Sequence, residues 1–151
     1  MRTSLPRPGY ELSRLLRQAD QALTRRLGEL LAFQDTSVHE WRVLGVLADG
    51  EGHPMSEIAE AVVVPAPTLT RIIDRMVENN LVYRRIDPID RRRVLVFCSA
   101  RGRSLYGRLQ RQLALHEAQF EGDPNLAELV RLLEWLVNVL EGRPSEQTAP
   151  R

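Results

Sequence analysis

Residues 64–76 read VPAPTLTRIIDRM, the most informative segment of the chain for its architecture. Two prolines stand where a helix begins, because proline costs little in the first helical turn and fixes φ near its helical value. Apolar residues then recur at helical spacing from Leu69 onward, with threonines and arginines on the other side. The helix is expected to stop at Asn79-Asn80, since asparagine tolerates the left-handed conformation of a helix end. We therefore predict a short helix with one buried face and one hydrogen-bonding face.

Three helices are predicted before this segment. Apolar residues recur at three- and four-residue steps from Tyr10 to Leu31, which is typical of one long amphipathic helix. Ser37 and Glu40 have the spacing of a capping box, so a second helix should begin after Ser37. Ser56 is the expected N-cap of a short third helix.

Two strands and two further helices follow the segment. Residues 81–86 and 94–98 have the composition of strands, and the loop between them, DPIDRRR, carries a proline and three arginines. Such a hairpin is a β-wing. After it, Ser99 should cap a fifth helix, and Asp123, followed by a proline at the first helical position, should open a sixth.

The basic residues are concentrated around these features. All 21 basic residues are arginine, and the net charge of the 151-residue chain is only +1. Between Pro65 and Arg103, however, nine arginines stand against four acids, a local excess of five positive charges. Such an excess is typical of a surface that binds phosphate, although a solvated basic face would show the same count.

These elements predict a mainly α fold with a small β-wing, in the order four helices, hairpin, two helices. Residues 36–99 form the expected winged helix-turn-helix DNA-binding domain, and residues 10–35 and 100–141 the helical dimerisation region. Residues 1–9 are expected to be a flexible arm and residues 142–151 a disordered tail. The apolar stripes of the long helices are broader than one winged domain can cover, which favours a homodimer. The alternative is that these helices cover their own winged domain.

The segment at 64–76 resembles the recognition helix of the MarR (multiple antibiotic resistance regulator) family. The family usually has glycine at the position of Asn80, and its peroxide-sensing branch uses a cysteine in the first helix, where this chain has none. The resemblance implies a DNA-binding transcription regulator, a repressor by expectation, that binds a palindromic operator as a homodimer. It covers nearly the whole chain from Tyr10 to Glu141 and extends in order to Glu40–Leu44, Leu81–Arg85, Asp87–Arg92 and Ser99–Gly102.

The resemblance implies that the hydrogen-bonding face of this helix enters the major groove of double-stranded DNA. Arg71 is the candidate for a bidentate contact with guanine O6 and N7. Arg75, one turn later, would reach a phosphate or pair with Asp74 or Glu78. The residues of this segment predicted to contact DNA are Pro65, Ala66, Pro67, Thr68, Thr70, Arg71 and Arg75.

The wing is predicted to supply a second contact with DNA. Arg92 would enter the adjacent minor groove, where narrow A·T-rich stretches concentrate negative potential. Asp90 is expected to hold the Arg92 guanidinium by a salt bridge. Arg91 and Arg93 would touch the DNA backbone or hold the wing together. A solvated charge cluster is the alternative interpretation of this loop.

Other classes of function find little support in the sequence. The three histidines are scattered over different elements and Cys98 is the only cysteine, so we expect no metal site, no cofactor and no enzyme activity. No apolar run could span a membrane and the N-terminus lacks a signal-peptide core. We therefore expect a cytoplasmic protein, nucleoid-associated when bound to its operator. A winged-helix module that binds protein without DNA is the remaining alternative, and the arginine-tipped wing argues against it.

Members of the MarR family often respond to small aromatic acids bound between the dimerisation helices and the winged domain. On that resemblance, Phe33, His39, Trp41 and Arg42 are the candidate ligand-binding residues, since they offer aromatic faces and a cation near that junction. The alternative is that Trp41 belongs to the core and Arg42 pairs locally.

Overall fold

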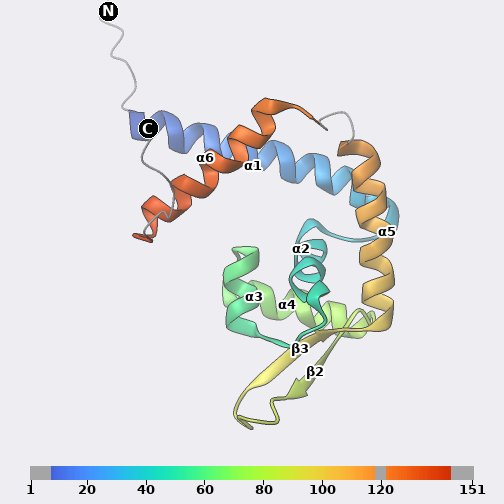
Figure 1. Ribbon diagram of the computed structural model, residues 1–151. Helices are drawn as coiled ribbons and strands as arrows, with labels where there is room; N and C mark the ends of the chain where they lie inside the picture. Colours follow the sequence, from blue (N-terminus) through green and yellow to red (C-terminus); the bar gives the residue numbers. More distant parts are fainter. Residues whose placement is uncertain (1–7, 118–121, 144–151) are drawn as a thin grey trace, which may run out of the picture. The chain divides into compact units, whose positions relative to one another are not determined.

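The computed structural model describes residues 8–117 and 122–143 and divides the chain after Leu113 into two units (Figure 1). The predicted fold class is confirmed, because the described residues are mostly helical with one small antiparallel sheet. The second unit holds the end of α5 and α6 (Pro124–Leu140). The elements of the first unit are α1 (Pro8–Leu31), α2 (Val38–Val46), β1 (His53–Pro54), α3 (Met55–Val62), α4 (Ala66–Glu78), β2 (Val82–Ile86), β3 (Val94–Cys98) and most of α5 (Ala100–Glu117), with 3-10 turns at Ala32–Gln34 and Leu47–Asp49.

The predicted capping box of α2 is present. Ser37 Oγ accepts a hydrogen bond from the Glu40 N–H at 3.2 Å, and the Glu40 carboxylate accepts one from the Ser37 N–H at 2.8 Å. The predicted N-cap of α3 was wrong, because Pro54 takes the cap position in an extended conformation and Ser56 lies inside the first turn.

The predicted arm and tail are described only at their inner ends. Helix α1 begins at Pro8, two residues before the predicted start, since proline fits the first turn of a helix. Gly142 follows α6 with a positive φ of 66°. Residues 1–7 and 144–151 lie outside the described residues.

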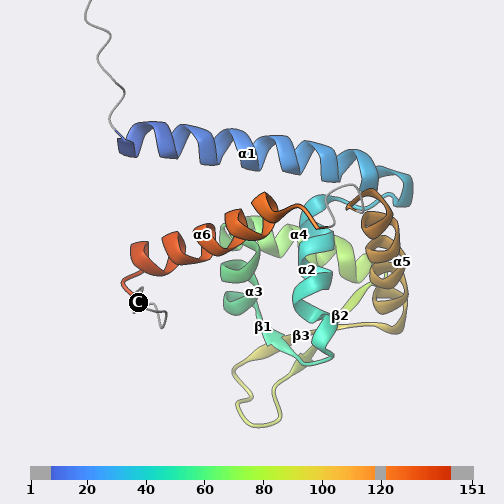
Figure 2. The ribbon, with the colours of Figure 1, turned by 45° about the horizontal axis from the view of Figure 1, so that its top comes forward.

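The sheet has three strands in the order β1-β3-β2, and they lie together at the lower end of the first unit (Figure 2). Strands β2 and β3 form the predicted hairpin, with Val82 opposite Cys98 and Ile86 opposite Val94. Strand β1 was not predicted, and its His53 pairs with Val96 of β3. The sheet therefore joins the segment before α3 to the wing.

One hydrophobic core holds the first unit together. Helix α4 contributes Leu69, Ile73 and Met76, which are all fully buried. Burying an apolar side chain of this size stabilises a fold by about 1.5–3 kcal/mol, so these three contacts favour a single orientation of α4. They pack in one cluster with buried residues of the neighbouring elements, among them Val43, Leu44, Ile58, Val62, Val96 and Leu109.

The predicted stop of α4 at Asn79-Asn80 is confirmed. Asn80 has a φ of 56°, and the Leu81 N–H donates to the Met76 carbonyl oxygen at 2.8 Å. The predicted cap of α5 also lies here. Ser99 Oγ donates to the Asn80 carbonyl oxygen at 2.7 Å and accepts from the Gly102 N–H at 2.9 Å. The end of α4 and the start of α5 are thereby fixed to each other.

Helix α6 begins at its predicted cap and exposes its apolar residues. The Asp123 carboxylate accepts a hydrogen bond from the Asn125 N–H at 2.8 Å. No residue of α6 is buried, and the side chains of Leu129 and Trp135 are 51% and 52% exposed. None of the described helices combines the length and the hydropathy that a membrane crossing requires.

Substitutions at two glycines of α5 test how closely the start of this helix packs against the backbone of Leu81. A Cβ at Gly102 would lie 2.1 Å from the Leu81 carbonyl oxygen, whereas one at Gly107 would meet nothing closer than 3.7 Å. We expect Gly102→Ala to lower the free energy of unfolding by about 1–3 kcal/mol, because backbone atoms must move. Gly107→Ala is the matched control and should raise it by up to about 1 kcal/mol, since alanine favours helix. Urea unfolding measures both, and equal stability of the two variants would contradict this packing.

Candidate nucleic-acid interface

The outer face of α4 carries every residue of this helix segment that was predicted to contact DNA. Pro65 is the N-cap in an extended conformation, and Pro67 lies in the first turn, as expected. Thr70 donates its hydroxyl hydrogen to the Ala66 carbonyl oxygen at 3.0 Å, which leaves its oxygen as an acceptor only. The seven exposed residues are Pro65, Ala66, Pro67, Thr68, Thr70, Arg71 and Arg75.

Two ion pairs connect α4 to its neighbours. Arg75 pairs with the buried Glu40 of α2, at 3.4 Å between Nε and Oε1. An intramolecular partner for Arg75 was one of two predicted alternatives, but that partner is neither Asp74 nor Glu78. Asp74 instead pairs with Arg84 of β2, at 2.6 Å between Oδ1 and Nη2. Helix α4 is thus linked both to α2 and to the wing.

The loop between β2 and β3 is folded by an aspartate at its start. Asp87 is buried, and its Oδ1 accepts hydrogen bonds from the N–H groups of Ile89 at 2.8 Å and Asp90 at 3.3 Å. The Asp87 N–H donates to the Arg93 carbonyl oxygen at 3.0 Å, which closes the loop. A short carboxylate that bonds the backbone two residues onward is the usual geometry of an Asx turn.

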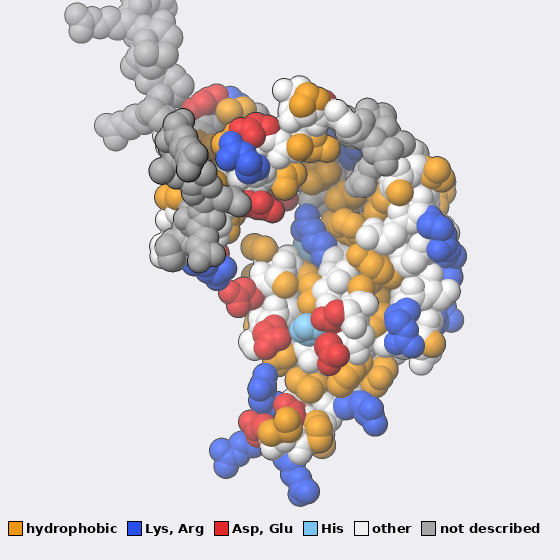
Figure 3. Space-filling view, in the orientation of Figure 1, with side chains coloured by type: hydrophobic (Ala, Val, Ile, Leu, Met, Phe, Trp, Pro, Cys, Tyr) orange, Lys and Arg blue, Asp and Glu red, His pale blue; other side chains and the backbone are white. Residues whose placement is uncertain are grey.

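Asp90 does not play the role that the sequence suggested. Its Oδ1 accepts from the backbone N–H of Arg92 at 3.0 Å, and the described residues show no ion pair between the two side chains. The expected salt bridge was therefore wrong, because a two-residue separation brings the carboxylate to the backbone rather than to the guanidinium. Arg91, Arg92 and Arg93 are all exposed, and basic side chains project from the lower end of the first unit in Figure 3.

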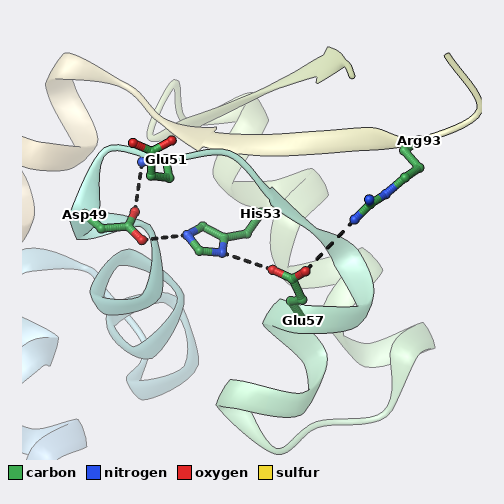
Figure 4. A network of polar contacts seen from close by, with 5 residues as sticks. All are labelled: Asp49, Glu51, His53, Glu57 and Arg93. Carbon is green, nitrogen blue, oxygen red and sulfur yellow. Dashed lines mark hydrogen bonds and ion pairs between the residues drawn. The ribbon is translucent and has the colours of Figure 1, made fainter. Parts of the chain in front are cut away.

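A histidine with two carboxylate partners lies where the wing meets α3 (Figure 4). His53 Nε2 is 2.8 Å from Asp49 Oδ2, and its Nδ1 is 3.3 Å from Glu57 Oε2. The other oxygen of Glu57 is 4.0 Å from Arg93 Nη2. Partial burial is the largest single influence and lowers the pKa of His53, but Asp49 and Glu57 together outweigh it and raise that pKa. In the sequence, Asp49, His53 and Glu57 are marked only by their four-residue spacing, and they lie in different elements of the structure.

Comparison with known proteins identifies the family of this fold. A model of the MarR family matches residues 37–94, from α2 through the wing. The HTH-type transcriptional repressor IacR of Pseudomonas putida is 30% identical over 137 residues, which cover 89% of this chain and 80% of that protein. The chain belongs to the MarR family.

Two further relatives of this MarR-family chain come from Escherichia coli. The homoprotocatechuate degradative operon repressor is 27% identical over 136 residues, covering 87% of this chain and 90% of that protein. The crystal structure of a MarR mutant complexed with operator DNA superposes with a TM-score of 0.74 at 26% identity, covering 83% of this chain and 93% of that one. The protein is therefore a DNA-binding transcription regulator, and its relatives are transcriptional repressors rather than enzymes.

The MarR-family regulator has a pocket in its first unit that contains one of the four candidate ligand-binding residues, His39. Phe33 is 82% exposed, Trp41 packs against the core, and Arg42 pairs with Asp20 at 3.8 Å. Within the described residues, His39 Nδ1 and Trp41 Nε1 are buried without a hydrogen-bond partner. The pocket has a volume of about 490 Å³ and is lined by Thr24, Gly28, Ala32, Asp35, Thr36, Ser37, Val38, His39 and Arg75.

The two carboxylates around His53 make folding stability dependent on pH. Because the pKa of His53 is raised in the folded chain, its contribution is fully present below the unfolded value of about 6.5 and is lost as the pH rises through the folded value. We expect His53→Gln to cost more free energy of unfolding at about pH 5.5 than at about pH 8.5. Urea unfolding of both proteins at both pH values measures this, and an equal cost at the two pH values would refute a bridging imidazolium.

Proposed function

We propose that the protein is a repressor that binds a palindromic operator as a homodimer. In each subunit, α4 would enter the major groove, and the wing would reach the adjacent minor groove. The observation that carries this proposal is the single exposed face of α4, where Arg71 stands among two threonines and two prolines. On this face Arg71 is the candidate for reading guanine, and Thr68 and Thr70 can approach base edges or phosphates.

The wing supports the same proposal by the way it presents its arginines. Asp87 and Asp90 bond backbone N–H groups of the loop, so the loop is shaped without using the guanidinium groups. Arg91 and Arg92 make no side-chain ion pair among the described residues. Arg92 is the candidate for the minor groove, where a guanidinium is attracted by the concentrated negative potential of narrow A·T-rich DNA.

A second copy of the chain would cover the apolar faces that this subunit leaves exposed. On α1, Leu12, Leu15, Leu16 and Leu23 are all at least 37% exposed. Exposed apolar surface of this kind marks an interaction site, and two-fold pairing buries the same patch on both copies. We accordingly assign residues 10–35 and 100–141 to dimerisation and residues 36–99 to DNA binding. The apolar residues that α6 leaves exposed are Leu126, Leu129, Val130, Leu132, Trp135, Val137, Val139 and Leu140.

A small aromatic acid is the effector class that we propose for release from the operator. The name of the Escherichia coli relative includes an aromatic acid, homoprotocatechuate. In this chain the pocket beside His39 offers an imidazole and the Arg75 guanidinium to a carboxylate. Phe33, Trp41 and Arg42 remain candidates for contacts with the ring and the acid group.

Selection of bound duplexes from a random pool tests operator recognition. We expect an inverted repeat with half-site centres about 10 bp apart. Arg71→Ala should cost about 1–3 kcal/mol of operator binding and relax the preference at one symmetric position. The matched control is Arg108→Ala, which removes the same charge from the exposed surface of α5, where the only partner of Arg108 among the described residues is Ser104. Selection of a direct repeat, or equal effects of the two substitutions, would contradict the proposal.

Light scattering tests the assembly. The protein should have the mass of a dimer at micromolar concentration, and Leu129→Asp should shift it toward monomer, because a buried unpaired carboxylate is costly. Ile89 is 95% exposed on the wing, so Ile89→Asp serves as the control and should leave the mass unchanged. A monomeric wild-type protein would rule out the homodimer.

A further inference from the structure

Two ion pairs hold the recognition helix on either side of Arg71. Successive residues of an α-helix are about 100° apart around its axis, so Asp74 lies about 60° to one side of Arg71 and Arg75 about 40° to the other. Arg84 of β2 holds Asp74 at 2.6 Å, and Glu40 of α2 holds Arg75 at 3.4 Å. Rotation of α4 about its axis in either direction would lengthen one of these contacts.

Glu40 is the more constrained of the two anchoring groups. Its side chain is only 4% exposed, and its two oxygens have separate partners. Oε2 accepts from the Ser37 N–H at 2.8 Å, while Oε1 faces Arg75. A buried carboxylate is costly unless it is both hydrogen-bonded and paired with a cation. Arg75 therefore cannot leave for a DNA phosphate without uncovering the charge of Glu40.

We propose that Glu40 is a positioning residue for DNA recognition, which holds Arg75 so that α4 presents Arg71 to the bases at a fixed angle. Asp74, through Arg84, has the same role on the opposite flank. Arg75 is then an anchor of the helix and not a phosphate contact. This inference rests on the proposed reading of operator DNA by α4.

For Glu40→Gln, the positioning role and simple electrostatics predict opposite effects on DNA binding. Glu40→Gln removes the negative charge that faces Arg75, which by charge alone should tighten binding to every duplex. A glutamine at this position preserves the capping box, because its carbonyl oxygen can still accept from the Ser37 N–H. What the substitution removes is the charge that holds Arg75. The positioning role predicts a loss of preference for the operator over other sequences.

The experiment measures the ratio of affinities for the selected operator and a scrambled duplex at two salt concentrations. We expect Glu40→Gln to lower this ratio on the order of tenfold, a usual size for the coupling of paired residues. Arg75→Gln should lower the ratio equally without reducing the salt dependence, and the double variant should be no worse than either single variant. Asp74→Asn, at a side chain that is 51% exposed, should also lower the ratio and cannot fail through loss of a buried cap.

Glu78→Gln is the matched control, because it removes the same charge from the same helix and Glu78 makes no ion pair among the described residues. It should change both affinities by one factor and leave the ratio unchanged. If Glu40→Gln and Asp74→Asn keep the wild-type ratio while Arg71→Ala lowers it, the positioning role is overturned and the proposed function stands. If the wild-type protein itself prefers no duplex, the proposed function fails.

Discussion

The burial of one face of α4 fixes the direction in which this helix presents its polar residues. Leu69, Ile73 and Met76 are fully buried, and turning the helix would expose them at a cost of several kcal/mol. An α-helix has 3.6 residues per turn, so three fixed positions determine the direction of all the others. Arg71 and its polar neighbours are therefore held outward by contacts made on the opposite side of the helix.

The two ends of α4 are fixed in different ways, and the direction of the wing depends on the C-terminal end. Pro65 sets the start through its own restricted φ. At the other end, Asn80 turns the chain into the left-handed region, and the Leu81 N–H returns to the last turn of the helix. Strand β2 follows at once, so its direction is set by that turn. Ser99 Oγ then donates to the Asn80 carbonyl oxygen of the same turn, which fixes the start of α5 to the end of α4.

The helices and the caps of α2, α5 and α6 could be predicted from the sequence because their signals are local, whereas the cap of α3 was assigned to Ser56 and is Pro54. The box at Ser37 and the stop at Asn80 each lie within a few residues of the groups they satisfy. Strand β1 could not be predicted, since two residues with a proline show no alternation, and the strand exists only because β3 offers it an edge. The pair between Glu40 and Arg75 joins residues far apart in the chain, and such partners become visible only when the fold brings α2 against α4.

The intramolecular partners of the arginines show why a count of charged residues along the sequence overstates the positive charge that is available to bind DNA. Of the nine arginines between Pro65 and Arg103, four have partners in their own chain: Arg75 with Glu40, Arg84 with Asp74, Arg93 with Glu57, and Arg103 with the Cys98 carbonyl oxygen. The pairs of Arg84 and Arg93 join exposed groups and contribute little to stability, so their main effect is on geometry. The acids of the wing shape its loop, because Asp87 and Asp90 bond backbone N–H groups and leave Arg91 and Arg92 without an ion pair among the described residues. Part of the positive charge therefore orients other residues of the chain. The arginines that we propose for contact with DNA are a smaller set, which includes Arg71 and Arg92.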